Sequence, residues 1–354
     1  MYRVVQWATG NVGRHTIPGI DAHPDLELVG LWVSSKEKDG KDAGELAGLG
    51  RALGVSATND ADTLLALKPD CIVNTAMADH RLGEAIEDLI RFLKAGINVV
   101  ASGPVFLQYP YGVMPDAMID PIVDAAKSGG ASLFVNGIDP GFANDWLPLV
   151  VTSISERIEQ VRCMEILNYA TYNQPMVIFD IMGFGRSMDD VPFILTPGVP
   201  TTAWGSVVRQ IAAALDIELA GLEEHYERVP APETFEISAG TIEKGTQAGI
   251  RFEVRGVKDG RHAVVLEHVT RLRDDIAPDW PQPSGHGCYR VVIEGEPNYT
   301  VDLQLLGTDG DHNTAGLKAT AMRLVNAVPA VVEAQPGLVT ALDLPLITGR
   351  GLYR

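Results

Sequence analysis

The chain has 354 residues, of which 46% are hydrophobic and 21% are charged, and its formal net charge is −18 at pH 7. This length and composition are typical of a globular protein with a sizeable core and roughly two domains. The negative charge argues against a nucleic-acid surface. No apolar run reaches the length of about eighteen residues that a membrane span requires, so neither nucleic acid nor a membrane is expected as a partner.

Cysteine usage indicates a reducing compartment. Cys71, Cys163 and Cys288 lie far apart and lack metal-ligand spacing, which is typical of reduced core thiols. The first three residues lead directly into an apolar segment and leave no room for a signal peptide. We therefore expect a cytoplasmic protein that binds no metal.

The first fifteen residues carry a nucleotide-binding pattern. An apolar segment, 3–7, runs directly into ATGNVGRH at 8–15. A strand that enters a glycine turn and then a helix is typical of dinucleotide-binding units, because glycines let the backbone approach the pyrophosphate and the helix offers free N–H groups. Ala8 replaces the first glycine of the usual fingerprint, so the match is incomplete. We predict that the cofactor is bound by Gly10, Asn11, Val12, Gly13 and Arg14.

Strands and helices then alternate over residues 1–145. Apolar segments at 26–33, 71–76, 97–102 and 132–137 are typical of buried parallel strands. From Leu82 to Leu93 apolar residues recur at helical spacing, and Gly96 is expected to end that helix. The alternation predicts an α/β fold with a doubly wound parallel sheet, a Rossmann-type domain.

The pattern changes after residue 145. Strand-like segments at 161–167, 250–257, 263–272, 289–295 and 299–307 are separated by turn residues, and one amphipathic helix is expected near 207–215. These features predict an α+β domain with a mixed or antiparallel sheet over 146–314. A helical segment at about 315–354 is expected to rejoin the first domain.

The tip of the second strand bears on the choice of dinucleotide. NAD sites place an acid there to bind the ribose 2′-hydroxyl, whereas this sequence reads SSKEK at 34–38. Hydroxyls and lysines suit a 2′-phosphate instead, although surface lysines can also form a solvated loop. We predict NADP(H), with NAD(H) also possible, bound at this tip by Ser34, Ser35 and Lys38.

Three further loops are expected near the nicotinamide, since ligands of open α/β sheets bind beyond the carboxyl ends of the strands. They supply Thr75 and Ala76, then Ser102 and Gly103, and finally Asn136 as a partner for the carboxamide. Each loop also fits an ordinary turn between a strand and a helix. A dinucleotide domain joined to a second domain suggests hydride transfer to a bound substrate.

Four motifs together resemble a known superfamily. The segments VVQWATGNVGRH (4–15), SSKEKDGKDAGEL (34–46), NGIDPGF (136–142) and IMGFG (181–185) are similar to the dihydrodipicolinate-reductase-like superfamily, and within it to the native amine dehydrogenases and 2,4-diaminopentanoate dehydrogenase. The resemblance implies a Rossmann domain and an α+β domain that binds substrate and forms a homodimer. It also implies reversible NAD(P)H-dependent reductive amination of a small aliphatic ketone or aldehyde with ammonia.

Two departures from that group matter. The chain lacks the His-His-x-x-Lys-type helix of dihydrodipicolinate reductase, which argues against that activity. The amine dehydrogenases carry a catalytic Glu in the loop that corresponds to 102–110, and this loop contains no carboxylate. Amination requires proton transfers and benefits from a carboxylate near the nascent cation. The candidates for this role are Asp139, which also fits a simple turn before proline, Tyr109 and Tyr172.

The substrate pocket is expected to be largely apolar, which suits a small uncharged carbonyl compound. The residues predicted to line it are Phe106, Gln108, Asn168, Tyr169, Met176 and Phe179. Two alternatives remain open. The scaffold can reduce a carbonyl or a preformed imine without ammonia, or the chain is an inactive NADPH-binding sensor.

Overall fold

The computed structural model describes residues 1–78 and 80–353. The chain divides into two compact units, unit 1 with Met1–Ile138 and Leu317–Arg354, and unit 2 with Asp139–Gly316. Unit 1 carries a parallel sheet and unit 2 a mixed sheet. This confirms the predicted α/β class with a Rossmann-type unit and an α+β unit.

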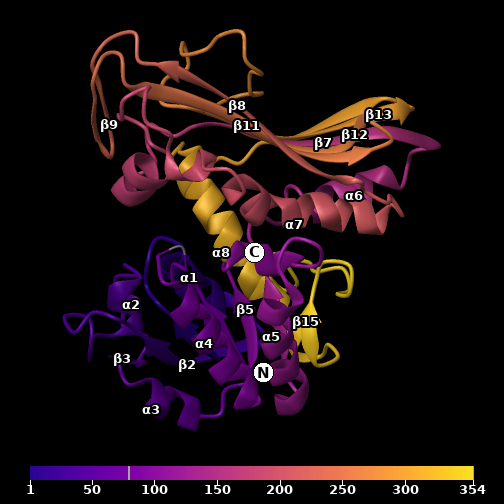
Figure 1. The fold of residues 1–354 in the computed structure, drawn as a ribbon. Coiled ribbons are helices and arrows are strands. Elements are labelled where there is room, and N and C mark those ends of the chain that lie inside the picture. Colours follow the sequence, from indigo (N-terminus) through magenta and orange to yellow (C-terminus); the bar gives the residue numbers. More distant parts are fainter. Residues whose placement is uncertain (79, 354) are drawn as a thin grey trace. The chain divides into compact units, whose positions relative to one another are not determined.

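Unit 1 is built on a seven-stranded parallel sheet (Figure 1). Its order is β15-β6-β5-β4-β1-β2-β3, so the chain changes direction across the sheet at β1, which pairs with both β2 and β4. In such sheets ligands bind at the carboxyl ends of the strands beside this switch point. The strands are β1 (Tyr2–Trp7), β2 (Leu26–Trp32), β3 (Ala57–Thr58), β4 (Cys71–Asn74), β5 (Asn98–Ala101), β6 (Ser132–Val135) and β15 (Gly337–Val339).

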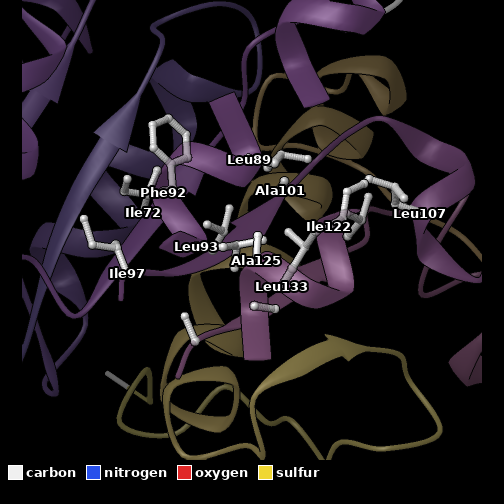
Figure 2. Packing of buried hydrophobic residues seen from close by; sticks show 14 of the residues in the cluster. Ile72, Leu89, Phe92, Leu93, Ile97, Ala101, Leu107, Ile122, Ala125 and Leu133 are labelled. Carbon is white, nitrogen blue, oxygen red and sulfur yellow. The ribbon is translucent and has the colours of Figure 1, made fainter. Parts of the chain in front are cut away.

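Helices cover both faces of this sheet, and its strands are therefore mostly apolar. One face packs against α3 (Ala61–Ala66), α4 (Leu82–Lys94) and α5 (Asp116–Gly129). Figure 2 shows this layer, in which Leu89, Phe92 and Leu93 of α4 share a cluster with Ile72 of β4. The other face packs against α1 (Gly13–Ala22) and the unit 1 part of α8 (His312–Val332). The short helix α2 (Ala43–Leu46) follows β2.

Unit 2 contains a six-stranded sheet of order β14-β13-β7-β12-β11-β8. The pair β12 and β7 is parallel and the other pairs are antiparallel. A separate two-stranded hairpin joins β9 (Phe235–Ile237) to β10 (Gly240–Ile242). The strands of the large sheet are β7 (Arg157–Asn168), β8 (Gly221–Pro230), β11 (Gln247–Lys258), β12 (Arg261–Arg271), β13 (Cys288–Glu296) and β14 (Tyr299–Leu303).

Two helices, α6 (Trp146–Thr152) and α7 (Val199–Ala214), pack on one face of this sheet (Figure 1). The sequence predicted α7 to begin near 207, but it begins at Val199, because a proline in its first turn favours helix initiation there. Three short helical segments complete the fold: η1 (Val105–Gln108), the π-helical η2 (Met176–Ile181) and η3 (Phe193–Leu195). Among the described residues, the helices lack the combination of length and apolar character needed to cross a bilayer.

Candidate functional site

The turn between β1 and α1 depends on three small residues. Ala8 has a φ of 73°, in the left-handed region that favours glycine, and it occupies the first glycine position of the fingerprint. At Gly13, an added Cβ would collide with the carbonyl oxygen of Ala8 and lie 2.7 Å from Thr75 Oγ1. At Gly10, an added Cβ would meet no atom of the chain within 4 Å. The fold itself therefore requires Gly13, whereas Gly10 borders open space.

A buried side chain, Gln6, holds this turn in place. Gln6 Nε2 donates to the carbonyl oxygens of Trp7 (3.1 Å) and Ala8 (2.8 Å) and to Thr75 Oγ1 (2.8 Å). Thr16 Oγ1, on α1, donates to Gln6 Oε1 at 2.5 Å. The network fixes β1, α1 and the end of β4 relative to one another. It also places the hydroxyl of Thr75, a predicted cofactor ligand, inside the turn.

The same turn fits the pyrophosphate of a dinucleotide. Within the described part of the chain, the N–H groups of Asn11, Val12 and Gly13 make no hydrogen bond. They open helix α1, which has no side-chain cap and no acidic residue in its first turn. Free N–H groups and the positive end of the helix dipole favour phosphate oxygens. The open space beside Gly10 leaves room for such a group.

The loop after β2 brings a cation to the glycine turn. Lys38 Nζ donates to Thr9 Oγ1 at 2.9 Å, so the ammonium group is anchored beside the turn. Ser34 is exposed, and the hydroxyl of Ser35 accepts a backbone hydrogen bond within its own loop at 3.2 Å. Arg14 is exposed in the first turn of α1. Their contact with a 2′-phosphate stays a prediction.

The other predicted cofactor residues follow β4, β5 and β6, at the same edge of the sheet as the glycine turn. The N–H of Ala76 donates to the side chain of the last β4 residue at 3.0 Å, and the N–H of Ser102 donates to that residue's carbonyl at 3.0 Å. Gly103 follows and is partly buried. Asn136 is buried, and its Oδ1 accepts from Arg323 Nε of α8 at 2.9 Å. Parallel strands thus gather these residues at one edge, as the sequence predicted.

The segment after β5 forms η1, in the loop where the resemblance implies a catalytic Glu and this chain has no carboxylate. Phe106 and Leu107 pack in the core cluster of unit 1 that Figure 2 draws, which favours a structural role for Phe106. Gln108 is 1% exposed. Tyr109 makes an edge-on ring contact with Tyr111, with centroids 5.2 Å apart. The proposed pocket and catalytic roles of these residues stay predictions.

In unit 2, five side chains form a row across one face of the large sheet. Tyr289 of β13 lies opposite Glu165 of β7, and Glu165 lies opposite His268 of β12. His268 in turn lies opposite Phe252 of β11, which lies opposite Tyr226 of β8. Opposite residues project to the same face with Cβ atoms about 4.5–5.5 Å apart. The strand register therefore places a carboxylate and an imidazole side by side among aromatic rings.

His268 lies between two carboxylates. Its Nε2 is 3.2 Å from Asp139 Oδ1, and its Nδ1 is 3.4 Å from Glu165 Oε1. Each ring nitrogen faces an acceptor, so the imidazole satisfies both carboxylates only when both nitrogens carry protons. Trp204 Nε1, on α7, donates to the same oxygen of Asp139 at 2.9 Å, and the hydroxyl of Tyr169 donates to Glu165 Oε1 at 2.7 Å. Asp139, Glu165 and His268 are referred to below as the carboxylate–imidazole cluster.

The electrostatics of the cluster agree with this geometry. The side chain of His268 is 5% exposed and that of Asp139 is 2% exposed. Although burial lowers the pKa of His268, the facing carboxylates of Asp139 and Glu165 outweigh it and raise the pKa to about 10. Burial and the nearby Glu165 raise the pKa of Tyr169 and of Tyr289 well above the usual range. The cluster therefore holds an imidazolium beside neutral tyrosines.

Aromatic rings surround the imidazolium. Phe252 stacks on His268 with ring centroids 4.8 Å apart and an interplanar angle of 6°. Trp204 meets the same ring edge-on at 4.6 Å. Aromatic faces stabilise positive charge in a buried site. Within the described residues, no group of His, Cys, Asp and Glu side chains is arranged to hold a metal ion.

The remaining predicted pocket residues also lie in unit 2. The ring of Tyr172 is 5.0 Å from that of Tyr169, so both tyrosines adjoin the cluster. Asn168 instead donates to a carboxylate of an exposed loop at 2.6 Å. Met176 begins η2 and is 42% exposed, while Phe179 packs over the backbone of the β9–β10 hairpin. The structure thus brings Asp139 and the two tyrosines together and leaves Asn168 outside the cluster.

Sequence reasoning missed Glu165, His268 and Trp204. Glu165 and His268 each stand in an apolar strand segment at a position that alternation assigns to the buried face. A buried titratable group requires a partner. The presence of Glu165 and His268 at buried positions of apolar strands was therefore the signal that the sequence offered. The partners come from strands about a hundred residues apart in the sequence, so the register alone reveals them.

The fold and the two sites define a class of protein. A doubly wound parallel sheet with an open, unpaired glycine turn binds a dinucleotide, and a second unit with buried acid–base groups is typical of nicotinamide-dependent oxidoreductases.

Comparison with known proteins specifies the family. Residues 142–350 match the 2,4-diaminopentanoate dehydrogenase C-terminal domain. The chain is 43% identical over 350 residues to an amine dehydrogenase of Streptomyces virginiae, covering 98% of this chain and 97% of that protein. It is 24% identical over 330 residues to 2,4-diaminopentanoate dehydrogenase of Acetoanaerobium sticklandii, covering 88% of each. The solved structure of an amine dehydrogenase from Mycobacterium smegmatis matches with a TM-score of 0.78 at 23% identity, covering 99% of this chain and 97% of that one.

The chain therefore belongs to the amine dehydrogenase family, which includes the 2,4-diaminopentanoate dehydrogenases. This confirms the resemblance recognised in the sequence. Members of the family are oxidoreductases that act on CH–NH2 donors with a nicotinamide cofactor.

Proposed function

We propose that this protein catalyses the reversible, NAD(P)H-dependent reductive amination of a small aliphatic ketone or aldehyde with ammonia. The observation that carries the proposal is the 43% identity to an amine dehydrogenase along 98% of the chain. The glycine turn of unit 1 and the carboxylate–imidazole cluster of unit 2 supply the two chemical requirements, a dinucleotide site and a buried acid–base group.

The residues of unit 1 hold the cofactor in this proposal. When bound, the nicotinamide supplies the hydride that reduces the substrate carbon. Free N–H groups at Asn11, Val12 and Gly13 bind the pyrophosphate. Lys38, anchored at Thr9, neutralises a 2′-phosphate, and the hydroxyls of Ser34 and Ser35 donate hydrogen bonds to it, so NADP(H) is preferred while NAD(H) remains usable.

Asp139 is the proposed acid–base residue. Its Oδ1 is held by Trp204 and His268, while its Oδ2 has no partner among the described residues and is available to exchange a proton with the substrate. In the amination direction, the carbinolamine needs a proton on its leaving hydroxyl and loses one from its nitrogen. Tyr109 and Tyr172 are proposed as further proton donors, and Gln108 as a group that orients the carbonyl. In this proposal Asp139 performs the proton transfers for which η1 carries no Glu.

A homodimer formed through unit 2 completes the proposal. The face of the large sheet opposite α6 and α7 carries a network in which Arg162 and Arg251 pair with Glu253 and Glu267. The side chains of Arg162 and Arg251 are each still 24% exposed in the single chain, and a second subunit is the layer proposed to cover them. Sedimentation analysis would reveal a dimer, and a monomer at all concentrations would contradict this part of the proposal.

The decisive experiment measures NADPH and NADH oxidation with a panel of short ketones and aldehydes, with and without high ammonium at alkaline pH. The proposal expects oxidation only when ammonium is present, with an amine as product. Oxidation without ammonium would show a carbonyl reductase, and tight cofactor binding without turnover would show a sensor. Asp139→Asn is expected to reduce ammonium-dependent turnover by about a hundredfold or more. Full activity of this variant would remove Asp139 from the mechanism.

A further inference from the structure

Asp139 is held by two side chains that meet at one of its oxygens. Trp204 Nε1, on α7, donates to Oδ1 at 2.9 Å, and His268 Nε2, on β12, lies 3.2 Å from the same oxygen. The side chain of Asp139 is 2% exposed, so these contacts, rather than bulk water, decide its orientation and its charge. The indole cannot change its protonation state, whereas the imidazole can. The protonation state of His268 therefore decides the environment of Asp139.

The far side of the same ring faces a second carboxylate. Strand pairing places Glu165 of β7 directly opposite His268, and Glu165 Oε1 lies 3.4 Å from Nδ1. In a Ser-His-Asp triad, a carboxylate at the nitrogen remote from the reacting group fixes the imidazole tautomer and stabilises its positive form. Glu165 has that place here, because Asp139 is at the other nitrogen. A neutral ring has one N–H and would leave one of the two carboxylates without a donor.

Glu165 depends on His268 for its balancing charge. The residue is 4% exposed, and the hydroxyl of Tyr169 donates to Oε1 at 2.7 Å. Among the residues that the structure describes, His268 is the only basic side chain that pairs with Glu165. Glu253 and Glu267, on the opposite face of the sheet, pair with arginines instead. An arginine stays charged at any working pH, whereas the pair of Glu165 and His268 keeps its charge only while the imidazole keeps both protons.

We propose that Glu165 is a positioning residue for the amination reaction: it keeps His268 doubly protonated, and His268 in turn keeps Asp139 ionised and oriented. The inference deepens the proposed function and rests on it, since Asp139 is the acid–base residue there. An ionised Asp139 can remove a proton from the carbinolamine nitrogen, and an imidazolium at Oδ1 favours the ionised form. Tyr169 acts one step further out, by holding the carboxylate of Glu165 beside the ring.

The groups around the ring define the pH range in which this control operates. Asp139 and Glu165 are the titratable groups that face His268; they outweigh burial, which lowers its pKa, and raise that pKa to about 10. The rings from β11 and α7 that contact the imidazole do not titrate. Tyr169 and Tyr289, which adjoin Glu165, stay neutral because burial raises the pKa of each well above the usual range. Without the carboxylate of Glu165, the ring should therefore lose a proton nearer to neutral pH.

The pH dependence of kcat/KM tests the inference, with the carbonyl substrate that gives the fastest ammonium-dependent turnover in the panel. Each variant is compared with the wild type at the same pH, so that the titration of ammonia cancels. Glu165→Gln is expected to lose about tenfold or more of its activity relative to wild type between about pH 7.5 and about pH 9.5. Glu165→Asp keeps the charge and should restore most of that loss. Glu294→Gln, the same change as Glu165→Gln at an exposed position of β13, is the control and should show no such trend.

A second measurement needs no turnover. Nitrogen NMR of the imidazole rings, with the His268 signals assigned from their absence in His268→Gln, reports the protonation of each ring nitrogen. In the wild type both nitrogens should carry protons at about pH 8.5, and in Glu165→Gln the ring should become neutral at least about one pH unit lower than in the wild type. A wild-type ring that is neutral at about pH 8.5 would overturn the inference, even if Glu165→Gln fails to fold.

The two readouts separate this inference from the proposed function. Ammonium-dependent turnover together with an unshifted ring titration in Glu165→Gln would leave the function standing and refute the role of Glu165. A loss of activity that is the same at every pH would also refute it, because it would indicate only a structural role. A wild type that turns over no amine or carbonyl compound, with a ring titration that shifts in Glu165→Gln, would refute the function and leave the control of His268 by Glu165 standing.

Discussion

Ala8, Gly10 and Gly13 occupy similar places in the fingerprint but meet different physical demands. Ala8 keeps a left-handed backbone, with a φ of 73°, because Gln6 and Thr75 hold its carbonyl oxygen. Gly13 has no room for a side chain, whereas a Cβ added at Gly10 would meet no atom of the chain within 4 Å. Stability and cofactor binding can therefore be separated by single substitutions in this turn.

Gly10→Ala is expected to leave the unfolding free energy within about 1 kcal/mol of wild type and to weaken NADPH binding by about tenfold or more, since its methyl group enters the pyrophosphate space. Gly13→Ala is expected to destabilise the protein by about 1–3 kcal/mol or more even without cofactor, because the Cβ collides with the backbone at Ala8. Urea unfolding and a fluorescence titration with NADPH measure the two effects. Tight NADPH binding by Gly10→Ala would contradict the assignment of the turn.

His268 makes stability depend on pH in the alkaline direction. Burial lowers the pKa of His268, but the carboxylates of Asp139 and Glu165 outweigh burial and raise this pKa from 6.5 to about 10 in the folded protein. A raised pKa means that the folded state holds the proton more tightly than the unfolded state. The stabilisation is therefore complete below pH 6.5 and is lost as the pH rises towards about 10.

The prediction is that unit 2 of the wild type loses unfolding free energy between about pH 7 and about pH 9, and that His268→Gln loses much less over the same range. Hydrogen exchange at β7 and β12 measures this locally, which is appropriate for a chain of two units. Equal slopes for the two proteins would show that His268 does not carry the extra proton.

At the scale of the elements, the large sheet of unit 2 carries charge on both faces. The face opposite the cluster buries Glu253 and Glu267, which are 3% and 1% exposed. Arg251 Nε donates to Glu267 at 2.8 Å, and Arg162 Nη1 donates to Glu253 at 2.7 Å. Glu267 thus has arginine partners on both neighbouring strands, whereas the arginine partners of Glu253 lie on its own strand and on β7. These pairs balance the buried charge and link the three strands.

Glu267→Gln is expected to destabilise unit 2 by about 1–3 kcal/mol, because it removes a buried carboxylate that accepts from two partly buried arginines, which keep Glu253 as a partner. The exposed Glu294→Gln should change stability by less than about 0.5 kcal/mol. Chemical denaturation of both variants provides the comparison. Equal stabilities would mean that the network contributes nothing beyond what the strands supply.

Local pattern predicted most of the elements but not their partners. The helix from Leu82 is confirmed as α4, since its apolar stripe and its terminal Gly96 lie within one short segment. The edge strands β3 and β15 have two and three residues, too few for a pattern to mark them. The row from Tyr289 to Tyr226 depends on pairing between distant strands, which no local signal specifies.

At the scale of the whole molecule, the family and the fold follow from contiguous motifs, and those could be recognised in the sequence. The candidate site of unit 2 is different, because its members come from five separate parts of unit 2. Asp139 was found because it stands within a motif, whereas Glu165 and His268 stand alone in apolar strands. A site whose residues come together only on folding gives little signal in any one segment of the sequence.

Net charge belongs to the same scale, and it makes the cofactor assignment testable. A chain with a net charge of −18 repels NADPH as a whole, so a 2′-phosphate must be held by local cations such as Lys38. Lys38→Glu is expected to weaken NADPH binding by about tenfold or more and NADH binding by less than about threefold. Lys94→Glu, at an exposed position near the end of α4, makes the same change in net charge away from the turn and should leave both affinities within about twofold. Fluorescence titrations with NADPH and NADH measure these affinities. Equal losses of NADPH affinity in the two variants would assign the effect to the overall charge of the protein. An unchanged NADPH affinity in Lys38→Glu would remove Lys38 from the cofactor site.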